Sequence, residues 1–243
     1  MSPETLSLDL VIPVYNEESQ LDACVARALK FIAAEGLAGV RLIIADNGST
    51  DKTKDLGKAL ARREEKVSYL QVGKKGVGLA LKTAWSRSTA ECVGYMDLDL
   101  ATDLKHLSEA VSSLESGLFD FVVASRRLPQ SEVVGRSALR TFTSWGFNTL
   151  LRKTLQVGFS DGMCGFKFLK REAFNALSER YIFTDDWFFA TEILIKAEWE
   201  SMTIKEIPVR WTDDPSSKVR LLETISRYLG DIRRMKQERG SAR

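Results

Sequence analysis

Short apolar runs alternate with longer segments whose apolar residues recur every three or four positions. The first pattern is typical of buried strands and the second of helices with one buried face. The runs predict strands at Leu8 to Val14, Val40 to Ala45, Val67 to Val72, Glu91 to Met96 and Phe119 to Ala124. The intervening segments predict helices at Ser19 to Ala34, from the turn at residues 46–51 to about Arg63, at Gly78 to Ser88 and at Asp103 to Ser116. This alternation predicts an α/β fold with a mostly parallel sheet flanked by helices.

The second half of the chain is less regular. It predicts helices at Ser137 to Leu155, Trp187 to Trp199 and Val219 to Lys236, and strands at Cys164 to Leu169 and Met202 to Trp211. We find no internal repeat and no evident linker. The 243 residues therefore predict a single domain with a C-terminal elaboration. Its parts are a first half of about residues 7–125, a second half of about 126–218 and a terminal amphipathic helix of about 219–236.

Two carboxylates directly follow the apolar run Cys92 to Met96. Side chains alternate along a strand, so Asp97 and Asp99 leave the sheet on the same side. Their negative charges repel, and a hard divalent cation such as Mg²⁺ or Mn²⁺ would relieve that repulsion while leaving positions open for diphosphate oxygens. The alternative is that both residues only cap the next helix.

Polar residues follow four of the predicted strands. They are Tyr15-Asn16-Glu17, Asp46-Asn47, Gly73-Lys74-Lys75-Gly76 and Asp97-Leu98-Asp99. Ligands of such sheets bind beyond the carboxyl ends of the strands, so we expect the site at this edge. No G-x-G-x-x-G follows the first strand and no P-loop motif is present, which excludes those two nucleotide-binding classes. The glycine-rich segment 73–78 either lets the backbone approach a ligand, with Lys75 reaching a phosphate, or is a flexible loop.

Composition narrows the class of protein further. Hydrophobic residues make up 44% of the chain and charged residues 28%, as in ordinary globular proteins. A net charge of +2 argues against a general nucleic-acid binder. We expect no secretory signal at the start of the chain and no membrane span, and three reduced, widely spaced cysteines, which together predict a cytoplasmic protein. The single histidine, His106, excludes multi-histidine metal sites and is expected to be structural.

Several motifs together resemble a known family. Ile12-Pro13-Val14-Tyr15-Asn16-Glu17-Glu18, Ala45-Asp46-Asn47-Gly48-Ser49-Thr50-Asp51, Lys75-Gly76 and Met96-Asp97-Leu98-Asp99 resemble the inverting family-2 glycosyltransferases of the GT-A fold. Later segments are similar to polyprenyl-phosphate sugar synthases, above all to the dolichyl-phosphate glucosyltransferase branch. These segments are Ser125-Arg126-Arg127, Ser160 to Lys167, Trp187-Phe188-Phe189 with Glu192, Ile207 to Trp211, and Ser217-Lys218. The resemblance covers about residues 7–235.

The resemblance implies roles for the residues of the first half. Pro13, Tyr15, Glu17, Asp46 and Lys75 would bind the donor, with Asp46 suited to accept from a base N–H. Asp97 and Asp99 would hold Mg²⁺ or Mn²⁺ against the donor diphosphate. Three positions depart from what relatives commonly carry, and these are Asn47, Ala101 and Ala190. The departure at Ala101 leaves a third side-chain ligand to the metal open.

The same resemblance implies the reaction. A hexose, with glucose favoured, would pass from a nucleoside-diphosphate sugar to a polyprenyl phosphate with inversion. UDP-glucose is the favoured donor and GDP-mannose the alternative. The acceptor phosphate is already ionised near neutral pH, so it requires cations and no general base. We expect Arg126, Arg136, Arg140 and Lys218 to bind it and Asp99, Arg126 and Asp161 to be catalytic, although Arg140 on a solvated helix face is an equal alternative.

Two other functions stay open at this stage. A soluble alcohol acceptor, such as a glycan or secondary metabolite, would need a base, for which Asp161 is one candidate. The departures at Asn47, Ala101 and Ala190 instead fit an inactive nucleotide-sugar-binding protein.

The terminal helix raises the question of membrane attachment. Leu222, Ile225, Leu229 and Ile232 share one face, and Arg220, Arg227 and Arg234 recur on another. Such a helix either lies on an anionic membrane surface or packs its apolar stripe on the domain. The first alternative predicts peripheral attachment to the cytoplasmic face of the membrane, and a membrane-protein partner would serve the same purpose.

Overall fold

The structure, a computed structural model, describes residues 5–213 and 221–241. The strands are β1 (Leu8–Val14), β2 (Val40–Asp46), β3 (Val67–Gln71), β4 (Cys92–Met96), β5 (Phe121–Ser125), β6 (Glu132–Val134), β7 (Phe166–Lys170), β8 (Ile204–Pro208) and β9 (Arg210–Thr212). The helices are α1 (Leu21–Ala34), α2 (Thr53–Arg63), α3 (Val77–Arg87), α4 (His106–Glu115), α5 (Ala138–Leu155), α6 (Arg171–Arg180), α7 (Phe189–Trp199) and α8 (Leu221–Ser241).

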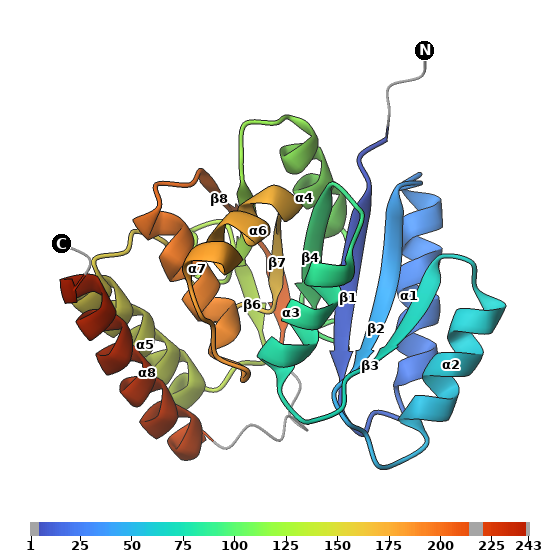
Figure 1. The fold of residues 1–243 in the computed structure, drawn as a ribbon, viewed down its shortest axis with the longest axis horizontal. Helices are drawn as coiled ribbons and strands as arrows, with labels where there is room; N and C mark the ends of the chain where they lie inside the picture. The colour runs from blue at the N-terminus through green and yellow to red at the C-terminus, as the bar shows by residue number, and fades with distance from the viewer. Residues whose placement is uncertain (1–4, 214–220, 242–243) are drawn as a thin grey trace.

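A seven-stranded sheet in the order β3-β2-β1-β4-β7-β5-β8 forms the centre of the molecule (Figure 1). All neighbouring pairs are parallel except those of β7, which runs antiparallel to both β4 and β5. The chain moves outward from β1 through β2 to β3 and then returns to the other side of β1 as β4. At such a reversal of strand order, here between β1 and β4, α/β sheets bind ligands beyond the carboxyl ends of the strands. Asp97 follows β4 directly at this point.

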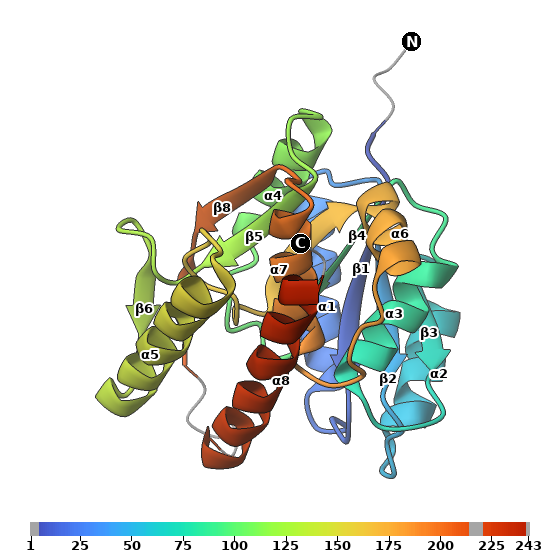
Figure 2. The same cartoon turned by 60° about the vertical axis from the view of Figure 1, so that its left-hand side comes forward.

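Helices cover both faces of the sheet (Figure 2), and apolar side chains of the sheet form a core cluster with them on each face. Leu8, Leu10 and Ile12 of β1 belong to the core cluster that includes residues of α1, α2 and α4. The intervening Val11 belongs to the opposite cluster, with residues of α3, α5, α6, α7 and α8. This alternation along β1 is the strand period of two, and it confirms the expected α/β sandwich.

The second half contains the features that the hydrophobic pattern did not resolve. The expected strand at 164–169 is β7, shifted to Phe166–Lys170 and antiparallel. The single strand expected at 202–211 is interrupted at Val209, so that β8 joins the large sheet and β9 pairs with β6 in a separate two-stranded sheet. Strand β6 and helix α6 were not predicted.

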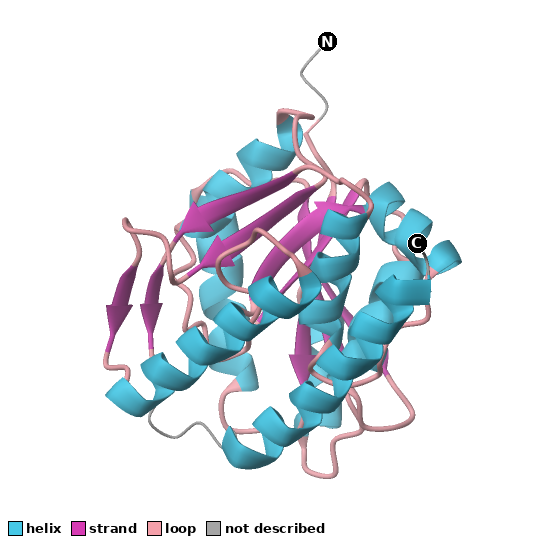
Figure 3. Cartoon of the chain, turned by 90° about the vertical axis from the view of Figure 1, so that its left-hand side faces the viewer, coloured by secondary structure: helices cyan, strands magenta, loops and turns pink. Residues whose placement is uncertain are grey.

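Helices α5 and α8 lie side by side at one end of the molecule, on the side that faces the viewer in Figure 3. Tyr228, Ile232 and Met235 of α8 are buried, and the Tyr228 ring lies 5.3 Å from the ring of Phe147 in α5. Arg234 of α8 reaches the buried Glu192 of α7, with Nη2 2.9 Å from Oε1. Ile232 of the expected apolar stripe therefore packs on the domain, as the second alternative predicted, whereas Leu229 of the same stripe is 48% exposed and the side chains of Leu222 and Ile225 lie outside the described residues.

Two expectations about the whole chain can be compared with the described residues. Cys24, Cys92 and Cys164 are free thiols and buried. Among the helices at residues 5–213 and 221–241, none combines the length and apolarity that a bilayer crossing requires. Lys218 and Arg220 lie outside the described residues.

Candidate functional site

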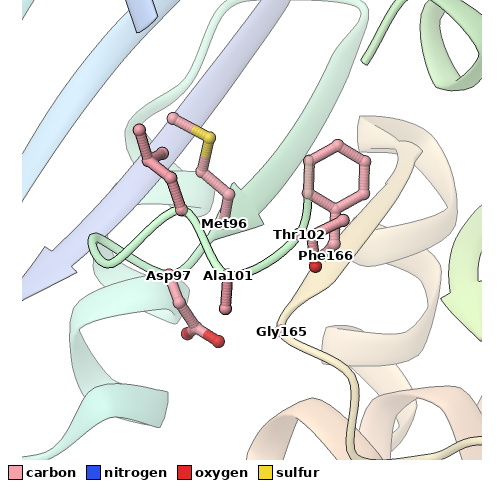
Figure 4. A pocket seen from close by; sticks show the side chains of 7 residues that line it. Met96, Asp97, Ala101, Thr102, Gly165 and Phe166 are labelled. Carbon is pink, nitrogen blue, oxygen red and sulfur yellow. The ribbon is translucent and has the colours of Figure 1, made fainter. Parts of the chain in front are cut away.

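The expected metal carboxylates lie where the antiparallel strand β7 begins. The backbone N–H of Asp97 donates to the carbonyl of Gly165 at 3.2 Å, which joins the loop after β4 to the start of β7. Asp97, Ala101 and Thr102 from that loop surround a small pocket with Gly165 and Phe166 (Figure 4). A Cβ atom at position 165 would come within 1.9 Å of Asp97 Oδ2, so only glycine leaves room for this carboxylate.

The Asp97 carboxyl suits a divalent cation. Its Oδ1 atom is shielded from solvent and has no hydrogen-bond partner among the described residues. Burial and the neighbouring charge of Asp99 raise the pKa of Asp97 to about 7, while Lys167 and Arg126 act in the opposite direction. A hard cation would satisfy the unpaired oxygen and relieve the repulsion, so the residues present fit a metal held by Asp97 and Asp99.

Among the described residues, no acidic, histidine or cysteine side chain supplies the third ligand that the sequence left open. In the part of the chain that the structure describes, no group of three such residues is placed to hold a metal ion. Asp99 Oδ1 also accepts from the backbone N–H of Ala101 at 2.9 Å, which fixes the turn that carries both carboxylates.

Hydrogen bonds hold strand β9 against the same turn, at residues 101–103. Thr102 pairs with Trp211, the N–H of Thr212 donates to the Ala101 carbonyl at 2.8 Å, and the N–H of Asp103 donates to the Arg210 carbonyl at 3.0 Å. His106 Nε2 accepts from the N–H of Arg210 at 2.9 Å, which confirms that its role is structural. These bonds place Trp211 beside the turn at residues 97–102, although 112 positions separate it from Asp99 in the numbering.

Two of the four arginine and lysine residues expected at the acceptor site lie against Trp211, and a third, Arg140, adjoins them. The guanidinium carbons of Arg126 and Arg136 lie 5.2 and 5.3 Å from the centre of its indole. Arg136 Nη2 donates to the carbonyl of Arg140 at 3.4 Å. Arg140 Nη1 in turn lies 2.7 Å from Asp213 Oδ1, so Arg140 belongs to the cluster and is not merely on a solvated helix face.

Arg126 is held in place by Asp161. Arg126 Nε donates to Asp161 Oδ2 at 2.7 Å and Nη2 donates to Oδ1 at 3.0 Å, and both side chains are almost completely buried. The N–H groups of Arg126 and Met163 donate to the same carboxylate. The nearby Arg126 charge holds the pKa of Asp161 well below its usual range in spite of burial. Asp161 is therefore a positioning partner of Arg126, and this geometry gives no support to its use as a general base.

Arg136 has a guanidinium N–H group that could donate a hydrogen bond to a ligand. Its Nε atom is buried and lacks a hydrogen-bond partner among the described residues. Burial and the like charge of Arg126 lower the pKa of Arg136, while Asp161 and Asp213 act in the opposite direction. An anion placed between Arg136 and Arg126 would be attracted to both guanidinium groups.

A buried lysine supports the segment between the two clusters. Lys167 Nζ donates to the carbonyl of Gly162 at 3.1 Å and to that of Cys164, and its side chain is buried beside the Tyr95 ring. Lys167 thereby fixes the turn that connects Asp161 with Gly165. Burial lowers the pKa of this ammonium group.

The donor-side residues gather at the ends of β1 and β2. Asn16 adopts a positive φ of 56° and its Oδ1 accepts from the N–H of Thr50 at 2.8 Å, which ties the two strand ends together. Asp46 accepts from the Ser49 N–H at 2.8 Å and from the Tyr69 hydroxyl at 2.6 Å. Its expected bond to a nucleobase stays a prediction. Pro13 and Glu17 flank Tyr15 on the same segment.

The glycine-rich segment has a structural function that the sequence did not reveal. A Cβ atom at Gly76 would come within 2.5 Å of the Asp185 carbonyl, and one at Gly78 within 2.7 Å of the Asp186 carbonyl. Those two carbonyls accept from the N–H groups of Leu79 and Gly78 at the start of α3. The two glycines thus leave room for the loop before α7, and the backbone carbonyls of that loop cap the start of α3. Lys75 Nζ lies 4.0 Å from the centre of the Tyr15 ring, at the expected donor side.

Residues before and within α7 form ion pairs, hydrogen bonds and core contacts that stabilise the domain. Asp185 forms ion pairs with Lys82 at 2.7 Å and Lys74 at 3.3 Å. Glu192 is completely buried and accepts from Thr184 while pairing with Lys196. Phe188 and Phe189 belong to the core, whereas Trp187 is half exposed.

The structure thus brings the expected residues into two adjacent clusters and a donor-side group. Asp97 and Asp99 form the first cluster, Arg126, Arg136 and Arg140 form the second, and Lys218 lies outside the described residues. Sequence reasoning did not assign roles to Gly165, Lys167 or Trp211. All three lie in the later segments that carry the family resemblance, but their roles depend on contacts that those segments do not encode locally.

Comparison with known proteins identifies the family of the chain. The chain matches the family model described as "Glycosyl transferase family 2" over residues 9–178. It is 32% identical to glycosyltransferase AglD of Haloferax volcanii over 90% of this chain, and it spans only 35% of that protein. It is 30% identical to a dolichyl-phosphate beta-glucosyltransferase of Mus musculus, covering 97% of this chain and 80% of the mouse protein.

A solved structure shows the same fold. Glucosyl-3-phosphoglycerate synthase from Mycobacterium tuberculosis, in complex with Mn²⁺, UDP-glucose and phosphoglyceric acid, superposes with a TM-score of 0.70. The alignment covers 95% of this chain and 79% of that one at 17% identity. At this identity the likeness concerns the fold, and it confirms the GT-A architecture. Since the family model spans well over half of the sequence, the chain belongs to glycosyl transferase family 2 and is a glycosyltransferase.

Proposed function

We propose that this enzyme transfers a hexose, with glucose favoured, from a nucleoside-diphosphate sugar to a polyprenyl phosphate, with inversion and with a divalent metal. The observation that carries the proposal is the position of the arginine cluster beside the metal carboxylates. Strand β9 connects the arginine cluster with the turn at residues 97–102 that carries Asp97 and Asp99. Its Trp211 pairs with Thr102 of that turn and also lies against Arg126 and Arg136.

Each cluster fits one substrate. Asp97 and Asp99 would hold Mg²⁺ or Mn²⁺ against the donor diphosphate, and the metal would stabilise the charge that develops on the leaving group. UDP-glucose is the favoured donor because structural neighbours of this fold were solved with UDP-glucose and Mn²⁺. The mouse and yeast relatives are named dolichyl-phosphate beta-glucosyltransferases, which supports a polyprenyl phosphate as the acceptor.

The chemistry requires little proton transfer. An oxygen of the acceptor phosphate forms a bond to the anomeric carbon, and the bond from that carbon to the β-phosphate oxygen breaks. The electron pair leaves with the nucleoside diphosphate and the anomeric configuration is inverted. Arg126 and Arg136 would hold the acceptor phosphate close to the donor against their mutual repulsion. Asp161 keeps the Arg126 guanidinium oriented toward this space.

The site is less suited to an alcohol acceptor. An alcohol must lose a proton to a base as it attacks. The Asp161 carboxylate already accepts from Arg126 through Nε, Nη2 and the backbone N–H. A carboxylate in this environment is a weak base. The arrangement therefore favours an acceptor that is ionised before it binds.

The test is transfer from labelled UDP-glucose or GDP-mannose to a short, water-soluble polyprenyl phosphate with Mn²⁺ or Mg²⁺. We expect a sugar phosphate product of inverted configuration, identified by mass and by the NMR coupling of the anomeric proton. Asp97→Asn should abolish transfer, whereas the exposed Asp22→Asn on α1 is the matched control. Transfer that survives EDTA, or transfer to alcohols in preference to phosphates, would contradict the proposal.

A further inference from the structure

Helix α5 presents a row of large apolar side chains to solvent. Leu139, Phe142 and Trp145 are 65%, 69% and 52% exposed. Their spacing of three residues places them along one side of the helix. The rings of Phe142 and Trp145 are stacked, with their centres 6.2 Å apart. This row of Leu139, Phe142 and Trp145 is called the α5 apolar row below.

The opposite side of α5 is also apolar. Phe147, Leu151 and Leu155 are buried in the core, where Phe147 contacts Tyr228 of α8. A helix on the surface of a soluble protein normally has one apolar side and one polar side. In α5 the outer side is apolar as well. An exposed apolar surface of this kind is typical of a site that contacts a membrane or another protein.

The α5 apolar row starts at the arginine cluster. Arg136 precedes the helix and Arg140 lies in its first turn, and the two are joined through the Arg140 carbonyl. Leu139 lies between them in the chain. A lipid whose phosphate is bound by this cluster would therefore have its hydrocarbon chain next to the beginning of the row.

The charge of this segment complements an anionic surface. Residues 126–155 contain six arginine or lysine residues and one acidic residue, Glu132, and of the six, Arg126 is paired with Asp161 and Arg140 with Asp213. Arg152 and Lys153 are exposed at the far end of α5. Aromatic residues next to basic ones are typical of helices that lie in the headgroup region of anionic bilayers.

The geometry points to an anionic lipid bilayer as the partner of α5, with Phe142 and Trp145 inserted at the boundary between headgroups and acyl chains. This inference rests on the proposed lipid acceptor, because the arginine cluster would then receive a phosphate that lies at the membrane surface. The sequence alone suggested the terminal helix α8 as the membrane contact, and this inference assigns that contact to α5. In the described part of α8, Tyr228, Ile232 and Met235 are buried and Leu229 alone among the large apolar side chains is exposed, whereas α5 exposes three in a row.

Vesicle sedimentation of the full chain tests this surface without any substrate. Vesicles of phosphatidylcholine with about a third phosphatidylglycerol should bind the protein, and Phe142→Ser with Trp145→Ser should weaken binding by at least about tenfold. The matched control is Leu118→Ser with Ile182→Ser, which removes two exposed apolar side chains elsewhere. The control should bind as the parent does, and circular dichroism should show that both variants are folded. Equal binding by parent and Phe142/Trp145 variant would overturn the inference.

Two further readouts separate the inference from its alternatives. The ratio of transfer to a long-chain acceptor in vesicles over transfer to a short soluble acceptor should fall in the Phe142/Trp145 variant and not in the control. If no acceptor is glycosylated but vesicle binding still depends on the α5 apolar row, the proposed function fails and the surface stands. If the parent sediments as a dimer that this variant dissociates, the row is an interface between two copies and the inference is overturned.

Discussion

Arg126 and Asp161 form a two-point ion pair inside the fold, with Nε to Oδ2 at 2.7 Å and Nη2 to Oδ1 at 3.0 Å. The pair connects the end of β5 with the turn before β7. Because both groups are almost fully buried, neither charge has an alternative partner in water. The pair therefore fixes the direction of the Arg126 guanidinium, on which binding of an acceptor anion would depend.

Asp161→Asn should destabilise the protein by about 3–5 kcal/mol, since it leaves the Arg126 charge buried without its counter-charge. Urea unfolding measures this loss, and the exposed Asp55→Asn on α2 is the control. In the variant that remains folded, transfer to a phosphate acceptor should fall through a higher acceptor KM, with the shape of the pH profile unchanged. Complete loss of kcat at every pH, with unchanged acceptor KM, would instead indicate a general base.

Gly165→Ala should displace the Asp97 carboxylate, because the new Cβ atom would come within 1.9 Å of Oδ2. We expect Mn²⁺ affinity, measured by calorimetry, to fall about 10–100-fold, as is usual when a metal ligand loses its supporting contact. Gly230→Ala on α8 is the control, since a Cβ atom there has no neighbour within 4 Å. Removal of metal with EDTA should abolish transfer in the parent and be reversed by added Mn²⁺. Unchanged Mn²⁺ affinity in Gly165→Ala would show that Asp97 is not a ligand.

Arg136→Gln should raise the KM for a short phosphate acceptor by about 10–100-fold, the effect expected from losing a charge-assisted hydrogen bond. The KM for the nucleotide sugar should remain within about twofold, because Arg136 is expected to bind the acceptor phosphate and not the donor diphosphate. Arg62→Gln, on the exposed side of α2, is the matched control. A rise in donor KM alone would place the donor, and not the acceptor, at this cluster.

The strand period made the placement of Asp97 and Asp99 at the end of β4 predictable from sequence, whereas their role as metal ligands stays a prediction. A buried run that ends in Asp-x-Asp places both side chains on one side of the sheet, and this argument uses no distant residue. The carboxyl ends of parallel strands then collect the other polar motifs at one edge, which the fold confirms. Tertiary contacts are required for the rest.

Contacts between distant segments decided what the local pattern left open. The sequence left open whether Gly76 and Gly78 let the backbone approach a ligand or belong to a flexible loop. In the structure they leave room for the backbone at residues 184–186, about a hundred positions away in the chain. Likewise, nothing near Arg126 indicates that Asp161 is its partner. The direction of β7 is also not encoded in its own residues, since a fully buried strand has the same apolar composition in parallel and antiparallel pairs. That direction brings Gly165 to Asp97.

His106 should make the stability of the protein depend on pH. Its Nε2 accepts from the Arg210 N–H, so the bond requires the neutral ring. Burial and the adjacent Lys105 lower the pKa of His106 below its ordinary value of 6.5. The unfolded chain then binds a proton more readily than the folded protein. The stabilising contribution is therefore complete above pH 6.5 and is lost as the pH falls below that value.

Comparison with His106→Gln isolates this contribution, because glutamine does not titrate. The free energy of unfolding of the parent, minus that of the variant, should be constant at alkaline pH and should decrease as the solution is acidified below pH 6.5. The lost bond lies next to Trp211, so indole fluorescence should report the same transition under native conditions. A difference in unfolding free energy that increases on acidification would mean that the protonated ring is the stabilised form, and that His106 interacts with Asp103 or Glu109 more strongly than with Arg210.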